Sequence, residues 1–279
     1  MAYFCIKTND NCFINYFMNN PSSLSSDFYI RKKKSKIYTN IFIHYKGNNI
    51  NTFYDNLSDY ITDCIIKIYE PKIIDKFILS NYFYFFDSEQ LEIKKNISLL
   101  IDSDINNRRK ELIKLALENY LSDNNTSMIL DGFITFRLKD YIEIIDYIVD
   151  LAVNNFLIKK EYFEFIELLR KYISKHESIL NTVHLLYFNN ESILLDSNFN
   201  IIPNSFDINL LSFSDIEFST NDYSLNTLLN ILPKNLYIHL VDSEDEFINT
   251  LKLIFENRIY FCNNCTICNY YKQNLDFKL

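Results

Sequence analysis

Glycine is almost absent from this chain. Only two glycines, Gly47 and Gly132, and four prolines occur among its 279 residues. Since glycine adopts positive φ angles without steric cost, few backbone positions can form glycine-dependent loops. Phosphate-binding P-loops and dinucleotide-binding fingerprints require closely spaced glycines, and these two are far apart. Both kinds of nucleotide site are therefore excluded.

The charge balance argues against a nucleic-acid partner. The chain carries 36 acidic and 28 basic residues, for a net charge of −8. Nucleic-acid-binding proteins are usually basic or concentrate basic residues on one face. The one basic run, at 31–36, is expected to be a solvated strand end or loop. We therefore expect no nucleic-acid partner.

The distribution of apolar residues predicts a cytoplasmic protein without a membrane span. Lys7, Asn9 and Asp10 interrupt any apolar segment that could serve as a secretion signal. No apolar run approaches the ~18 residues of a transmembrane helix. The densest run, at 82–86, is short and is predicted to be a buried strand. In a reducing compartment the six cysteines should be free thiols or metal ligands.

Residues 1–85 are predicted to form a mixed α/β N-terminal region. Segments 3–7 and 37–45 are rich in β-branched and aromatic residues, as strands are, and a turn is expected at 47–49. A helix should follow, because apolar residues recur there with helical spacing and form one stripe. The stripe consists of Leu57, Tyr60, Ile61, Cys64, Ile65 and Ile68. Cys64 is thus expected to be a packed core thiol.

Residues 86–178 are predicted to form a helical middle region. Its strongest pattern lies at 139–156, where only a narrow strip of the predicted helix is polar. A helix so apolar should be buried on most sides, as the central helix of its domain. A further helix is expected over 162–173, with its apolar residues facing inward.

Residues 179–279 are predicted to form an α/β C-terminal region that ends in a CxxCxxC motif. Strands are expected at 182–188 and 193–195, with a turn between them, as the start of a short β-meander. Strand, helix and strand are then expected at 236–241, 244–257 and 258–262, a βαβ unit whose two strands run parallel. The predicted fold class is therefore α+β.

The cysteine motif is the strongest candidate for a chemical site. Cys262, Cys265 and Cys268 have the spacing of metal-binding turns, in which neighbouring thiolates share one ion. The spacing also matches part of a ferredoxin loop, but the fourth cysteine and the proline after it are missing. Zinc is accordingly favoured over an iron–sulfur cluster. The alternative is three reduced thiols near the end of the chain.

His239 is the candidate fourth ligand. It lies near the end of the first strand of the predicted βαβ unit, and Cys262 closes the second. Parallel neighbours end at the same edge about 4.8 Å apart, so these side chains could complete a Cys₃His zinc set. In the competing arrangement His239 faces the core and the cysteine loop lies elsewhere. His44 and His184, in predicted strands, are assigned structural roles, and His176 should be exposed.

Three stretches together resemble the YtxC-like family of sporulation proteins. They are Asp131–Tyr141 with the sequence DGFITFRLKDY, the segment from Val149 to Ile166 that includes VDLAVNNFL, and the terminal CxxCxxC after Phe255–Arg258. The resemblance covers roughly residues 100 to 268. It implies an intracellular protein linked to endospore formation and no known enzymatic activity.

Two functional hypotheses remain open at this point. The first is a non-enzymatic structural or interaction protein with protein partners, which the lack of any recognisable catalytic constellation favours. The second is a metal-binding or redox protein that uses the terminal cysteines.

Overall fold

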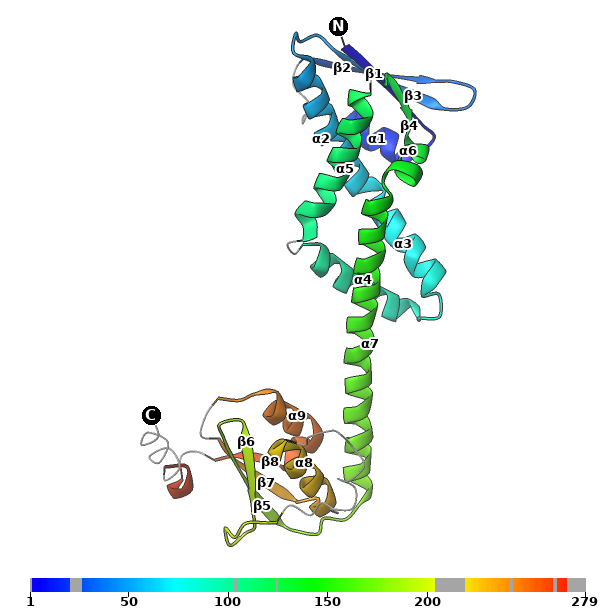
Figure 1. Ribbon diagram of the computed structural model, residues 1–279. Coiled ribbons are helices and arrows are strands. Elements are labelled where there is room, and N and C mark those ends of the chain that lie inside the picture. Colours follow the sequence, from blue (N-terminus) through cyan, green and yellow to red (C-terminus); the bar gives the residue numbers. More distant parts are fainter. Residues whose placement is uncertain are drawn as a thin grey trace, which may run out of the picture. The chain divides into compact units, whose positions relative to one another are not determined.

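The computed structural model describes residues 2–20, 27–102, 105–123, 125–203, 219–240, 243–262 and 265–269. The chain divides into two compact units, the N-terminal unit Met1–Ile158 and the C-terminal unit Lys159–Leu279 (Figure 1). Each unit contains a four-stranded sheet and several helices. The predicted α+β class is confirmed. Among the described residues, no helix has both the length and the apolar character of a membrane span.

The N-terminal unit is built on the sheet β2-β3-β1-β4. Its strands are β1 (Ala2–Thr8), β2 (Phe28–Lys34), β3 (Thr39–Tyr45) and β4 (Ser127–Ile129). Only β1 and β4 pair in parallel. Side chains alternate along β1, where Phe4 and Ile6 are buried and Tyr3 is exposed. Most of the basic run lies on the edge strand β2, with its side chains in solvent as expected.

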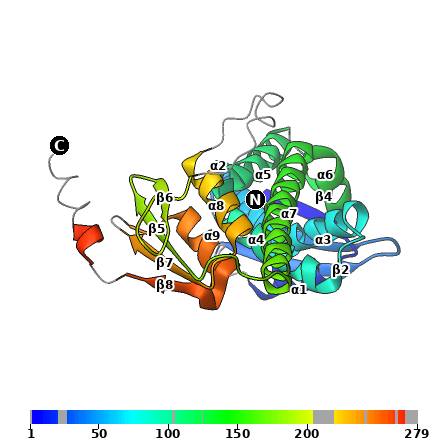
Figure 2. The same cartoon turned by 90° about the horizontal axis from the view of Figure 1, so that it is seen from below.

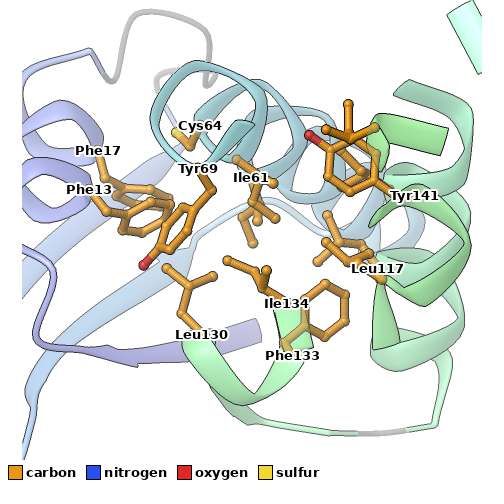
Figure 3. Packing of buried hydrophobic residues seen from close by; sticks show 14 of the residues in the cluster. Phe13, Phe17, Ile61, Cys64, Tyr69, Leu117, Leu130, Phe133, Ile134 and Tyr141 are labelled. Atoms are coloured by element: carbon orange, nitrogen blue, oxygen red, sulfur yellow. The ribbon is translucent and has the colours of Figure 1, made fainter. Parts of the chain in front are cut away.

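Helices complete the core of this unit around the buried face of the sheet. They are α1 (Asn11–Asn19), α2 (Ile50–Ile68), α3 (Glu70–Asn81), α4 (Asp87–Ile101), α5 (Ile105–Ser122) and α6 (Leu130–Arg137). Figure 3 shows the core, in which the rings of Phe13 and Phe17 lie beside Tyr69. Cys64 is fully buried in the apolar stripe of α2, as the sequence predicts.

The prediction of a strand at 82–86 is wrong. These residues form the connection between α3 and α4, where Phe83 and Phe86 are more than 70% exposed and Phe85 is buried. A run of five aromatic residues carries no period that separates strand from loop. The helix that follows supplies the local order, because the side chain of Glu89 accepts a hydrogen bond from the Phe86 amide at 2.9 Å and caps α4.

Helix α7 runs without a break from Lys139 to Lys175, where two helices were predicted. The linking residues 157–161, Leu-Ile-Lys-Lys-Glu, contain no glycine or proline and have good helix propensity. Ile145, Val149 and Ala152 are fully buried in the core of the N-terminal unit, as predicted for the first half. Ile166 and Ile173 belong to the core of the C-terminal unit. One uninterrupted helix therefore contributes to both cores.

The C-terminal unit contains the sheet β6-β5-β7-β8. Its strands are β5 (Thr182–Phe188), β6 (Glu191–Leu195), β7 (Asn235–Leu240) and β8 (Ile259–Phe261). Asn189 and Asn190 take φ values of 49° and 60° and form the two-residue turn of the β5–β6 hairpin. Strands β7 and β8, joined by α9 (Glu246–Phe255), pair in parallel as predicted.

The two faces of this sheet are covered differently. On one face Val183, Leu185 and Ile238 pack against α8 (Thr220–Ile231), α9 and the end of α7. Figure 2 shows α8 and α9 together on that side. Because side chains alternate along strands, His184 and His239 lie on the opposite face. That face carries the candidate site.

Candidate metal centre

His239 lies near the end of β7 and is only 3% exposed. Its neighbour Ile238 belongs to the helix-covered core, so strand alternation directs His239 to the other face. The sequence left this choice of face open. The structure directs the imidazole towards the cysteines rather than into the helical core.

The backbone brings the three cysteines to the same face. Cys262 follows β8, and its amide donates to the carbonyl oxygen of Ile238 at 2.9 Å, which extends the pairing with β7. Residues 266–269 then form one helical turn, closed by a bond from the Asn269 amide to the Cys265 carbonyl at 3.0 Å. Figures 1 and 2 show this turn, in red, on the side of the sheet away from α8 and α9.

Four potential ligand atoms converge there. The Sγ atom of Cys268 lies 3.7 Å from that of Cys265 and 3.8 Å from that of Cys262. The Nδ1 atom of His239 lies 3.4 Å from the sulfurs of both Cys265 and Cys268. All four ligand atoms lie within 4.8 Å of one another. In the part of the chain that the structure describes, no other group of three potential ligands converges in this way.

Sequence reasoning missed the role of a second histidine. His184, on β5, has its Nδ1 atom 2.9 Å from Nε2 of His239. The ring centroids of the two histidines are 5.1 Å apart. Only the parallel pairing of β5 with β7, which brings together residues more than 50 positions apart, creates this contact. The remaining histidines stand apart from the group: His44 lies in β3 and His176 is exposed.

The environment controls the protonation of the site. Burial lowers the pKa of both His239 and His184, so the neutral imidazole that binds metals is favoured. Burial, together with the neighbouring thiols, raises the pKa of Cys268 to about 12. Burial also acts to raise the pKa of Cys265, but hydrogen bonds, first from the Cys268 amide, bring it below the ordinary value. Without a cation the cluster therefore resists carrying several thiolates at once.

A family comparison identifies the broader relationship. The model of the YtxC-like family matches residues 55–260. The chain belongs to the YtxC-like family. Neither the comparison with curated proteins nor that with solved structures found a match. The matched region of this YtxC-like protein includes His184 and His239 and ends two residues before Cys262.

Proposed function

We propose that this YtxC-like chain is a cytoplasmic, non-enzymatic protein of endospore formation whose C-terminal unit holds one structural zinc ion. Cys262, Cys265, Cys268 and His239 would be the ligands. The zinc assignment depends on one observation, the spacing of the ligand atoms. The association with endospore formation depends on the family resemblance.

Four of the six distances between the ligand atoms support a tetrahedron around zinc. Zn–S bonds of about 2.3 Å and Zn–N bonds of about 2.0 Å imply S–S edges near 3.8 Å and S–N edges near 3.5 Å. The observed S–S distances are 3.7 and 3.8 Å, and the observed S–N distances are both 3.4 Å. Four edges of the tetrahedron therefore match those expected around a single ion.

The ligand set favours a structural role over a catalytic one. Catalytic zinc sites keep one position for water or substrate, whereas four protein ligands close the coordination sphere. An ion bound by His239 and the three cysteines would fasten the turn at 265–269 to the open face of the sheet. Zinc would thus stabilise the edge of the C-terminal unit and the surface that it presents to protein partners.

The alternative function is redox chemistry with iron. In a [4Fe–4S] cluster each cysteine binds a different iron, so the sulfurs do not surround one shared ion. Sulfurs 3.7 and 3.8 Å apart favour a mononuclear site. A single ferric iron in the same ligands would be coloured, whereas zinc is not.

The zinc proposal is tested by metal analysis of the full chain purified without oxygen. We expect one zinc per chain, no visible absorption, and loss of the metal in Cys265→Ser and in His239→Phe. Cys12→Ser is the matched control, because Cys12 is an exposed cysteine in the other unit. Stoichiometric iron with visible absorption would support the redox alternative, and a metal-free protein would refute both.

The sporulation proposal is tested by deleting the gene. We expect reduced spore yield or quality with nearly normal vegetative growth, restored by the wild-type gene. A Cys265→Ser, Cys268→Ser allele should restore sporulation poorly if zinc supports the function. A vegetative growth defect with normal spores would contradict the proposed process.

A further inference from the structure

We infer that His184 is a positioning residue that fixes His239 to bind metal through Nδ1. The inference rests on the proposed zinc site. It assigns a role to a residue outside the ligand set and specifies which nitrogen of His239 faces the ion. The contact that carries it is the 2.9 Å distance between Nε2 of His239 and Nδ1 of His184.

The direction of this hydrogen bond follows from the ligand geometry. Nδ1 of His239 lies 3.4 Å from two of the sulfurs, so it occupies the metal-facing position. A metal-bound neutral imidazole carries its proton on the other nitrogen, which here is Nε2. Nε2–H of His239 therefore donates, and Nδ1 of His184 accepts. His184 must then be neutral and carry its own proton on Nε2.

The sheet holds His184 in place for this task. Strand pairing sets His184 opposite Tyr237, and their ring centroids are 5.3 Å apart with nearly parallel planes. The centroid of the Phe199 ring lies 4.6 Å from the centroid of the His184 ring. These two aromatic contacts restrict the His184 ring, so its acceptor is already directed at His239 before a metal binds.

A fixed hydrogen bond of this kind should raise the affinity for metal. Groups that orient a ligating histidine typically contribute about 10- to 100-fold to metal affinity. Without His184, the His239 ring could rotate about its Cβ–Cγ bond and lose the preference for Nδ1. His184 is thus expected to affect the affinity of the site for metal. It should also affect which nitrogen of His239 binds the metal.

Two substitutions separate the hydrogen bond from packing. His184→Phe keeps an aromatic ring beside Tyr237 and Phe199 but removes the acceptor. His184→Asn places a side-chain oxygen near the former Nδ1 position and can still accept. With zinc affinity measured by chelator competition on the full chain, His184→Phe should weaken binding by about 10- to 100-fold. His184→Asn should recover most of this loss. His176→Phe, which replaces an exposed histidine of the same unit, should bind as the wild type does.

Nitrogen NMR of the zinc-loaded wild type, with labelled histidine, tests the same contact without a substitution. We expect His239 to be bound through Nδ1 and His184 to be neutral with its proton on Nε2. Binding through Nε2, or a His184→Phe affinity equal to that of the wild type, would overturn the role of His184 while leaving the zinc site standing. A wild-type protein that binds no zinc would instead refute the site itself.

Discussion

The two units of the chain differ in what fills their interiors. Among the described residues, the core of the N-terminal unit contains 34 buried hydrophobic residues, whereas that of the C-terminal unit contains 14. The larger core joins one face of its sheet to several helices and the first half of α7. The smaller core leaves the second face of its sheet to the histidines and cysteines. Since small cores contribute little net stability, a metal is a physically reasonable supplement in the C-terminal unit.

The buried polar groups differ in the same way. In the N-terminal unit, Arg109 and Glu70 form an ion pair deep in the core, and the Tyr141 hydroxyl donates to Glu70 at 2.8 Å. There the charges compensate one another. In the C-terminal unit, the three thiols around His239, of which Cys268 is buried, require an external cation to become thiolates together. Removal of metal by a chelator should therefore leave the stability of the N-terminal unit unchanged and should destabilise the C-terminal unit.

The largest expected effect comes from a substitution that disrupts the N-terminal core. Val149 is fully buried on α7, so Val149→Asp places an unpaired charge in an apolar interior, at a cost of several kcal/mol. We expect loss of hydrogen-exchange protection in β1 and β3. Tyr147→Asp is the matched control, because Tyr147 lies on the same helix and is 62% exposed. A Val149→Asp protein with unchanged melting temperature would show that this helix is peripheral to the core.

The second effect concerns the buried ion pair. Burial raises the pKa of Tyr141 far above its ordinary value, so the hydroxyl stays protonated and donates to Glu70. Arg109→Met leaves the Glu70 carboxylate buried without its cation and should destabilise the unit by about 3–5 kcal/mol. Urea unfolding gives this value directly.

The neighbouring residue supplies a control for the ion pair. Lys110 pairs with Asp63 at 2.8 Å, but both side chains are about half exposed. Lys110→Met should therefore cost at most about 1 kcal/mol. Equal effects of the Lys110 and Arg109 substitutions would mean that burial does not strengthen the pair.

The third expected effect is that of removing the metal with a chelator, and it should be confined to the C-terminal unit. A ligand present at 100 times its dissociation constant stabilises the folded state by about 2.7 kcal/mol, and chelation removes that contribution. Hydrogen exchange with and without a chelator should show lost protection in β7 and β8 and none in β1 and β3. Equal loss in both units, or in neither, would contradict the proposed division between an apolar core and a metal-supported one.

Much of the C-terminal unit was predictable because its signals are local. Paired asparagines between two apolar runs indicate a hairpin, and the strand–helix–strand pattern indicates a parallel pair. The cysteine spacing and the position of His239 at a strand end were visible too. The bond between His184 and His239 was not, because it depends on which distant strands become neighbours.

The errors elsewhere also have physical causes. Five consecutive aromatic residues at 82–86 resemble a strand, yet Phe85 alone of them is buried in the core, with Tyr82 packed half-buried against it. The sequence also predicted two helices within α7. The residues between them include no helix-breaking glycine or proline, so the helix continues from one core to the other.

The smallest expected effect compares a helix cap in each unit. Asp10 accepts from the Cys12 and Phe13 amides and caps α1, whereas Ser219 accepts from the Asp222 amide and caps α8. Replacing either residue with alanine should cost about 1 kcal/mol at neutral pH.

The stabilising contributions of the two caps should differ at acidic pH. Burial acts to raise the pKa of Asp10, but hydrogen bonds from Lys72 and from the backbone amides hold it below the ordinary value. The contribution of Asp10 is therefore present above the pKa of an unfolded aspartate, about 3.9, and is lost as the pH falls through the lower folded value. A serine hydroxyl does not titrate, so the bond that Ser219 accepts from the Asp222 amide, and the cost of losing it in Ser219→Ala, should persist there. Urea unfolding of both variants at neutral and acidic pH measures the difference, and equal loss of the two effects would contradict an ionised Asp10 cap.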